Sequence, residues 1–435
     1  MHSTAQVPSG LRALDTLVSP YGVVAGVSEA KPSPLLPRSR RATAEIGEPG
    51  LRRGAGIGAR AQGGGRDLRS ADLARFIAIA EAAERYAGCD TLHEERVWAT
   101  ADELAGECLE PARYPRCSAA EYAHPSCRVV PFDPGARIRW VRGLDLATRT
   151  DVFVPAAMAC YGLTDLVPAE RFCYPISTGY AVHTDPVEAV LRGAMEVVER
   201  DATAVLWLQQ LPLPSLNPHV LGDAVRRLTE DLERRFVRPH FFDATTDLGV
   251  PTVYCVLVGE HDHIARTTVG AGTGRSLPDA AVKAVLEAVS ITEFLHEHPQ
   301  VEAVAVEDMT SLTDASSYMA RPEHAGAFSF LLDGVEDRSG TAGATLPERP
   351  SDALDRVVGR LADMGARPVV VDRTPRELAD CGLTAVNVVI PDLQPMTVDP
   401  MVQFRGHARL YRAPARMGFP VRHEADLNPW PQPFA

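Results

Sequence analysis

Two stretches of the chain carry the same grouping of charged residues: two glutamates three positions apart, followed by an arginine. They read EAAER over residues 81–85 and EVVER over residues 196–200. Residues three or four apart are neighbours on a helix surface, so a helix would gather the charged side chains of each group. Several carboxylates attract hard divalent cations such as Mg2+, and arginine binds phosphate oxygens. The spacing therefore suggests a metal and phosphate site.

A third stretch, DAAVKAVLEAVSITEFL over residues 279–295, is apolar around most of the circumference of a helix. Its narrow polar stripe consists of Lys283, Glu287 and Ser290. A helix that is apolar nearly all round is usually buried, so we expect the stripe to face polar groups inside the protein. Since GxxxxGK[ST] occurs nowhere in the chain, a nucleotide site with Mg2+ would have to be built without that loop.

Ordinary solvated helix faces are the alternative to such a site. In the second helix Glu196 lies opposite the predicted apolar stripe, which consists of Val187, Leu191, Ala194, Val198 and Val205. In the first helix Glu84 falls on the predicted stripe itself, which consists of Leu73, Phe76, Ile77 and Ala80. A carboxylate-bridged metal hydrolase is a further alternative, but none of the three helices carries the Glu-x-x-His pairing of such sites.

Helices and strands that hold these residues follow each other along most of the chain. We predict helices over about 70–88, with Ser70 or Asp72 as N-cap, and over about 278–297. The pattern of residues 137–155 predicts a hairpin. Further strands are expected within 238–259, 264–274, 366–374 and 384–393. This mixture belongs to the α+β or α/β class.

Composition shifts mark the expected boundaries of the main domain. Residues 39–66 are rich in Gly, Ala and Arg, which predicts a flexible linker and separates an N-terminal segment, 1–65, from a domain over 66–427. The final segment, 428–435, has proline at every second position from Pro429 to Pro433, so it can form neither a helix nor a central strand.

Composition also excludes several classes of partner. The chain has 435 residues, of which 45% are hydrophobic, and this is enough to form a large core. The formal net charge of -13 argues against nonspecific nucleic-acid binding. We expect a cytoplasmic protein without a membrane segment, because the N-terminus lacks the order of a secretory signal. The eight cysteines include no CxxC pair and indicate neither a zinc knuckle nor a disulfide framework.

Taken together and in order, the three stretches resemble the YcaO superfamily, and more narrowly its azoline-forming cyclodehydratases. The similar segments are GGGRDLRSADLARFIAIAEAAERYAG, STGYAVHTDPVEAVLRGAMEVVERDA and GAGTGRSLPDAAVKAVLEAVS. The resemblance continues through RWVRGLDLATRTDVFVPA, VNVVIPDL and RLYRAPARMG to a proline-rich end, LNPWPQPFA. It implies an α+β, YcaO-like fold in which helices pack on mixed or antiparallel sheets and form an ATP site without a Walker loop.

Carried over position by position, the resemblance assigns roles to individual residues. The Mg2+ ligands would be Glu81, Glu84, Glu196, Glu199 and Glu287. The contacts to ATP would be Arg66, Ser177, Thr178, Arg200, Lys283 and Ser290. Thr178 and Ser290 replace the commoner Asn and Gln of the family, and their shorter side chains cannot reach as far, so a different nucleotide affinity or metal geometry is expected. Lys283 stands where Arg is commoner. The tail would act at the reacting centre through Pro429, Pro431, Pro433 and Ala435.

The implied reaction is ATP-dependent conversion of Cys, Ser or Thr residues of a ribosomally made precursor peptide to thiazolines or oxazolines. The resemblance also implies a separate leader-peptide-binding partner that is similar to adenylating enzymes, a flavin dehydrogenase, and a homodimer. Two alternatives stay open: a related enzyme that forms a thioamide or an amidine, and a noncatalytic nucleotide-binding scaffold of a peptide-modifying complex. Deletion of Pro429 to Ala435 is expected to lower ring formation by orders of magnitude while leaving ATP affinity nearly unchanged.

Overall fold

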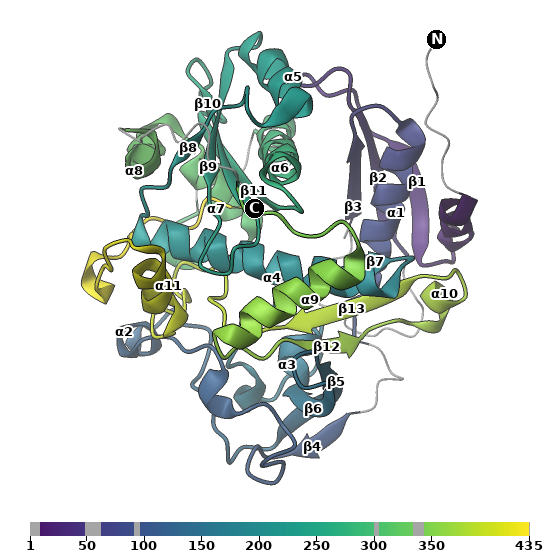
Figure 1. Ribbon diagram of the computed structural model, residues 1–435, viewed down its shortest axis with the longest axis vertical. Coiled ribbons are helices and arrows are strands. Elements are labelled where there is room, and N and C mark those ends of the chain that lie inside the picture. The colour runs from purple at the N-terminus through teal and green to yellow at the C-terminus, as the bar shows by residue number, and fades with distance from the viewer. Residues whose placement is uncertain (1–8, 48–61, 91–95, 300–303, 334–342, 435) are drawn as a thin grey trace. The chain divides into compact units, whose positions relative to one another are not determined.

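The structure is a computed structural model that describes residues 9–47, 62–90, 96–299, 304–333 and 343–434. The chain forms two compact units, and neither is continuous in sequence (Figure 1). Unit 1 consists of Met1–Arg113, Phe132–Ala194 and Arg367–Ile390. Unit 2 consists of Tyr114–Pro131, Met195–Ala366 and Pro391–Ala435.

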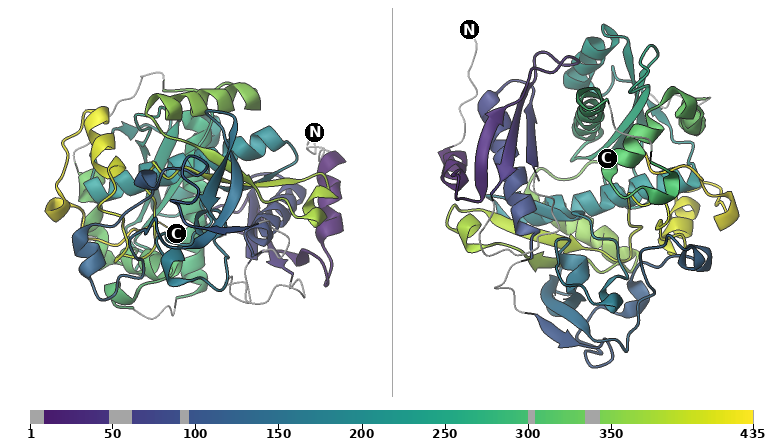
Figure 2. Two further views of the ribbon diagram at one scale, coloured as in Figure 1. Left: turned by 90° about the horizontal axis from the view of Figure 1, so that it is seen from below. Right: turned by 180° about the vertical axis from the view of Figure 1, so that it is seen from behind.

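Unit 1 contains a three-stranded antiparallel sheet in the order β1-β2-β3, on which helix α1 packs (Figures 1 and 2). The elements are β1 (Val24–Glu29), β2 (Arg40–Ile46), β3 (Gln62–Asp67) and α1 (Ala71–Ala87). The side chain of Ser70 accepts a hydrogen bond from Leu73 N, so the predicted first helix and its N-cap are confirmed.

Glycines in β3 allow α1 to lie directly on the strand. A Cβ placed on Gly63 would lie 2.4 Å from the carbonyl oxygen of Ala78, and one on Gly65 would lie 1.8 Å from that of Ala74. Only glycine avoids these clashes. The predicted flexible linker is therefore wrong at both ends of the stretch 39–66, because residues 40–46 and 62–67 are paired strands. Residues 48–61 lie outside the described residues.

A six-stranded sheet forms the rest of the framework of unit 1, in the order β4-β5-β12-β13-β7, with β6 paired to β5. Its strands are β4 (Val97–Ala99), β5 (Ile138–Asp145), β6 (Thr150–Pro155), β7 (Tyr180–His183), β12 (Val369–Asp372) and β13 (Thr384–Val389). The short helices α3 (Ala156–Ala159) and α10 (Arg376–Ala379) belong to the same unit. The predicted hairpin is confirmed as β5 and β6.

Unit 2 is built on a four-stranded antiparallel sheet in the order β11-β10-β9-β8, with helix α6 along it (Figure 2). The elements are β8 (Ser215–Leu216), β9 (Val237–Asp243), β10 (Thr252–Gly259), β11 (Thr267–Thr273) and α6 (Leu277–Glu297). Glycines again permit a close approach, because a Cβ on Gly270 or Gly272 would lie 2.3 or 2.4 Å from a carbonyl oxygen of α6. The two units thus repeat one construction, a glycine-bearing strand beneath an alanine-rich helix.

Helix α4 (Pro186–Gln209) contains the boundary between the units, which falls between Ala194 and Met195. In unit 2 its last turns enter an aromatic core around the fully buried Trp207. The remaining helices of unit 2 are α2 (Ala119–Ala123), α5 (Gly222–Glu233), α7 (Leu312–Met319), α8 (Ser329–Leu332), α9 (Pro350–Asp363) and α11 (Arg409–Met417). A buried ion pair joins α11 to α4, with Arg409 Nη2 2.7 Å from Asp201 Oδ2.

The apolar faces of two helices differ from the prediction at single positions. Ile77 is 43% exposed and Val187 is 37% exposed, because α1 buries mainly alanines and α4 has its first turn at the surface. All eight cysteines are free. In the described part of the chain, no helix combines the length and apolar character that crossing a membrane requires.

Candidate functional site

Arg200 lies among carboxylates in unit 2. Its Nη2 is 3.4 Å from Glu196 Oε1, and its Nη1 is 3.8 Å from Glu199 Oε1. Burial alone would lower the pKa of Arg200, but Glu199, Glu196 and Glu287 together outweigh it and raise this pKa. The guanidinium is therefore firmly charged, and the predicted grouping on α4 is formed.

Strand β11 holds Glu199 in place. Glu199 Oε2 accepts hydrogen bonds from Thr273 N at 2.7 Å and from Thr273 Oγ1 at 3.2 Å. Lys283 Nζ donates to the carbonyl oxygen of Thr273 at 2.7 Å. Thr273 therefore fixes both a predicted carboxylate and a predicted cation. Sequence reasoning did not select Thr273, although it lies in the glycine-rich turn that drew attention to α6.

Glu287 on α6 is held by the same strand, because its Oε2 accepts a hydrogen bond from Ala271 N at 2.9 Å. Burial raises the pKa of Glu287 to about 8, and the nearby Glu199 adds to this rise, although Arg200 opposes it. The raised pKa means that nearby positive charge does not fully stabilise the ionised form of the Glu287 carboxyl group. A bound cation would supply that charge, so the metal-binding role predicted for Glu196, Glu199 and Glu287 is compatible with this arrangement and stays a prediction.

The chemistry of these donors suits Mg2+, which binds oxygen ligands and commonly takes one or two carboxylates together with phosphate oxygens. Within the described ranges, no group of three or more His, Cys, Asp or Glu side chains is arranged to hold a metal ion by itself. Phosphate oxygens would have to complete the coordination.

The proline-rich tail packs against α4 in unit 2. Asn428 N and Nδ2 donate to the carbonyl oxygens of Leu208 and Trp207, at 2.9 and 3.0 Å. Trp207 Nε1 donates to the carbonyl oxygen of Trp430 at 3.0 Å. Further along, the ring of Phe434 lies 4.4 Å below the guanidinium carbon of Arg200.

The predicted tail residues differ in burial. Pro431 and Pro433 are buried, Pro429 is exposed, and Ala435 lies outside the described residues. Residues 427–434 form no helix or strand, as predicted. Phe434 is a tail residue that contacts a predicted site residue, Arg200.

Unit 1 holds five predicted residues, and Arg85 connects two of them, Glu81 and Ser177. Glu81 Oε2 accepts a hydrogen bond from Gly64 N at 3.0 Å, and its Oε1 lies 3.4 Å from Arg85 Nη2. Arg85 Nη1 donates to Ser177 Oγ at 2.6 Å. Burial raises the pKa of Glu81, although Arg85 and the Gly64 hydrogen bond oppose the rise. Glu81 thus has the same relation to β3 that Glu287 has to β11.

The other predicted residues of unit 1 are Glu84, Thr178 and Arg66. Glu84 is half-buried one helical turn from Glu81. The carbonyl oxygen of Thr178 accepts a hydrogen bond from Asn387 Nδ2 at 3.2 Å. Arg66 on β3 donates to Ser39 Oγ at 3.4 Å. Arg85 and Asn387, which position Ser177 and Thr178, were not among the predicted ligands.

Ser290, a predicted contact to ATP, differs from the other predicted residues in its hydrogen bonding. Ser290 Oγ donates to the carbonyl oxygen of Leu286 at 2.9 Å, so its hydroxyl is engaged within its own helix. A serine is too short to reach as far as the glutamine that commonly stands there in the resembled pattern. The role of Ser290 in nucleotide binding stays a prediction.

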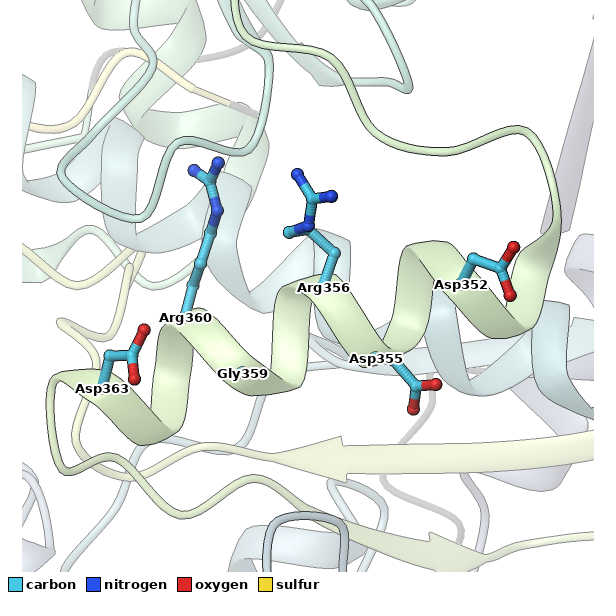
Figure 3. A pocket seen from close by; sticks show the side chains of 6 residues that line it. All are labelled: Asp352, Asp355, Arg356, Gly359, Arg360 and Asp363. Atoms are coloured by element: carbon cyan, nitrogen blue, oxygen red, sulfur yellow. The ribbon is translucent and has the colours of Figure 1, made fainter.

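A surface depression of about 600 Å3 lies along α9 (Figure 3). Arg356 and Arg360 project from the same side of the helix, and Asp355 points away from them (Figure 3). The lining residues are Asp352, Asp355, Arg356, Gly359, Arg360 and Asp363. None of the predicted nucleotide or metal residues is among them.

Several solved structures are similar to this chain. A heterocyclase in complex with substrate and cofactor is 24% identical with a TM-score of 0.81, and the match covers 98% of this chain and 57% of the heterocyclase. YcaO from Methanopyrus kandleri, bound with AMPPCP and Mg2+, is 19% identical with a TM-score of 0.59, covering 85% of this chain and 86% of that one. The E. coli microcin synthetase McbBCD complex with pro-MccB17 bound contains a chain that is 14% identical with a TM-score of 0.62, covering 94% and 96%.

These likenesses show the fold, and the chain spans just over half of the length of the first heterocyclase. The α+β prediction is therefore confirmed. The family model for YcaO cyclodehydratases, described as binding ATP and Mg2+, matches residues 64–394, which is most of the chain. The chain belongs to the YcaO family.

Proposed function

We propose that this protein is an ATP- and Mg2+-dependent peptide cyclodehydratase that forms thiazolines or oxazolines from Cys, Ser or Thr residues. The observation that carries the proposal is the cluster of Arg200 with Glu196, Glu199 and Glu287, against which the tail packs through Phe434. This cluster joins a phosphate-binding cation, metal-binding carboxylates and the predicted tail in one unit. A noncatalytic scaffold would not need the tail at that place.

The proposed reaction begins when the side-chain sulfur or oxygen of the peptide residue attacks the preceding backbone carbonyl carbon. The former amide oxygen then takes the γ-phosphoryl group of ATP, which releases ADP. The attack closes the ring, and the side chain gives up its S–H or O–H proton. Loss of the former amide oxygen as phosphate, with loss of the amide proton, then forms the C=N double bond. The protein's contribution is to position the reactants and stabilise the charge that develops on the phosphoryl group.

Each charged residue of unit 2 has a part in this proposal. Glu196, Glu199 and Glu287 would hold Mg2+, which neutralises phosphate charge. Arg200 and Lys283 would bind phosphate oxygens, and their positions are fixed by Glu196 and Thr273. The tail would direct its end toward the reacting amide.

In unit 1 we assign Glu81 and Glu84 to metal binding, with Arg85 holding Glu81. Arg66, Ser177 and Thr178 would contact the nucleotide. The hydrogen bond from Arg85 to Ser177 supports this assignment, because it brings a predicted carboxylate and a predicted nucleotide contact to one guanidinium.

The peptide substrate is proposed to be ribosomally made and to be presented by a separate leader-binding protein. The microcin synthetase relative, solved as a complex with pro-MccB17 bound, supports a peptide substrate and partner proteins. A flavin dehydrogenase that oxidises the rings, and a homodimer of this chain, remain parts of the same proposal.

Mass spectrometry of a candidate precursor peptide tests the function. The peptide is incubated with Mg-ATP, the leader-binding partner and this chain, and each ring should remove the mass of one water. A gain in mass from exchange of oxygen for sulfur when sulfide is supplied would favour a thioamide-forming enzyme. Loss of one water accompanied by an amidine linkage in the fragment spectrum would favour macrocycle formation.

The matched control replaces a surface carboxylate that is also paired with arginine. Glu230 on α5 pairs with Arg226 and Arg234 at the surface, so Glu230→Gln should form rings at the normal rate. Glu196→Gln should form none. Equal ring formation by the two variants would contradict the proposed site.

A further inference from the structure

The contacts of the tail with α4 define its direction. Asn428 and Trp430 form hydrogen bonds with Trp207 and Leu208 in the last turn of α4. Phe434 contacts Arg200, which lies seven residues before Trp207 on the same helix. The carbonyl oxygens of a last helical turn have no partner inside the helix, so Asn428 also caps α4. The tail therefore runs antiparallel to α4 and brings Phe434 beside Arg200.

The lengths agree with an extended tail. Four residues from Trp430 to Phe434 span about 12 Å in a polyproline conformation. The seven residues from Trp207 back to Arg200 span about 10 Å along a helix. Alternating prolines favour the extended form, so little conformational entropy is lost when the tail docks.

The guanidinium of Arg200 lies over the ring of Phe434. The ring is only 1% exposed, and the guanidinium carbon lies 4.4 Å from its centroid. A cation over the face of an aromatic ring is attracted by the negative charge of that face. Nη2 points to Glu196, while Nη1 is buried and makes no hydrogen bond in the described structure. A phosphate oxygen is a partner that would satisfy such a donor.

We propose that Phe434 is a positioning residue that holds the guanidinium of Arg200 for the phosphates of ATP, so that tail docking and Mg-ATP binding stabilise each other. This inference rests on the proposed nucleotide site and adds a role for the tail in forming it. It replaces the expectation that tail deletion leaves ATP affinity unchanged, because the tail contacts a phosphate-binding residue. Coupling between two sites is reciprocal, so bound Mg-ATP also favours the docked tail.

Calorimetric titration of the full-length chain with Mg-ATP, without peptide, tests the coupling. Phe434→Leu keeps an apolar side chain but removes the aromatic face, and its Kd for Mg-ATP should rise roughly tenfold. Pentafluorophenylalanine at position 434 keeps the size and shape of the ring but reverses the charge of its face. It should weaken binding at least as much as leucine does.

Phe419→Leu is the matched control, because Phe419 packs against the same apolar core as Phe434. Its Kd should equal that of the unaltered chain. Protection of the tail from carboxypeptidase should increase when Mg-ATP is added, and Phe434→Leu should abolish this increase. The pentafluoro variant keeps the test valid if leucine disturbs folding, since its packing is nearly conserved.

The outcomes separate this inference from the proposed function. Normal Mg-ATP affinity in both position-434 variants would overturn the coupling, whether or not rings form. Weakened affinity in those variants supports it even if no peptide is cyclised. Equal weakening in Phe419→Leu would make the effect one of packing and would overturn the role of the aromatic face. Absence of Mg-ATP binding by the unaltered chain would overturn both proposals.

Discussion

The proposed site of unit 2 depends on Arg200. The two glutamates of α4 beside it differ in burial and in hydrogen bonding. Glu196 is partly exposed and meets Arg200 at 3.4 Å. Glu199 is 9% exposed and accepts two hydrogen bonds from Thr273. The two glutamates, which look alike in sequence, therefore differ in how much they contribute to stability.

This difference gives a prediction for the two glutamine variants. Glu196→Gln and Glu199→Gln should each reduce Mg-dependent ATP turnover by at least about 100-fold. Only Glu199→Gln should also lower the free energy of unfolding, by about 1–2 kcal/mol, because it weakens charge-assisted hydrogen bonds at a buried site. Urea unfolding and an ADP-release assay measure the two effects. Equal loss of stability in both variants would contradict the account.

Buried histidine gives a prediction for pH. Burial lowers the pKa of His407 below its ordinary 6.5, although Asp392 and Asp201 oppose this and Arg116 adds to it. The unfolded chain therefore binds a proton near pH 6.5 that the folded chain does not. Stability is present above this pH and is lost as the pH falls through the folded pKa.

Urea unfolding of the chain at pH 7.5 and 5.5 measures this loss. Half-buried His240 and His183 have lowered pKa values as well, so part of the loss belongs to those residues. His407→Gln should reduce the loss, since glutamine does not titrate. A loss of the same size in the variant would contradict the assignment to His407.

At the scale of elements, the repeated pairing of strand and helix sets the position of the glutamates. Glu81 bonds to the middle of β3 and Glu287 to the middle of β11. In each case flanking glycines bring the helix close enough for this contact. The glycines are thus required for the site and are not signs of flexibility.

Replacing one such glycine should disrupt its unit. Gly65→Ala places a Cβ 1.8 Å from the carbonyl oxygen of Ala74, so unfolding should become easier by about 3 kcal/mol. Gly26→Ala in β1 is the control from the same sheet, because a Cβ there meets no atom within 4 Å. Thermal unfolding compares the two. Similar melting temperatures would contradict close packing of α1 on β3.

These elements show which features of the chain could be predicted. The helices α1, α4 and α6 have long, periodic apolar patterns. All three were predicted to exist, and the approximate ends of α1 and α6 were predicted correctly. The strand β3 was not, because GGGR has the composition of a linker and its helix partner is recognisable only in three dimensions. Ile77 was assigned to the buried face by periodicity, but alanines take that face since they allow a closer approach.

The candidate site was predictable where the chemistry lies in a local pattern. The grouping of Glu196, Glu199 and Arg200 lies on one helix, and the structure forms it. Thr273, Asn387 and Phe434 could not be chosen, since their roles depend on hydrogen bonds or ring contacts with residues far away in sequence. Long-range contacts of this kind leave no spacing to recognise.

At the scale of the whole molecule, the proposed function depends on transfer of a phosphoryl group from ATP to a peptide oxygen. The family, the fold and the charged cluster in unit 2 are all compatible with this transfer. ATP turnover alone does not identify the reaction, because other acceptors would also release ADP. The product that receives the amide oxygen, phosphate or water, does identify the reaction.

The most direct measurement follows that oxygen. A precursor peptide labelled with oxygen-18 at the backbone carbonyl before the reacting residue is incubated with Mg-ATP, the leader-binding partner and this chain. The account predicts that each ring formed places one labelled oxygen in the released phosphate. Ring formation with the label recovered in water, and unlabelled phosphate, would contradict it.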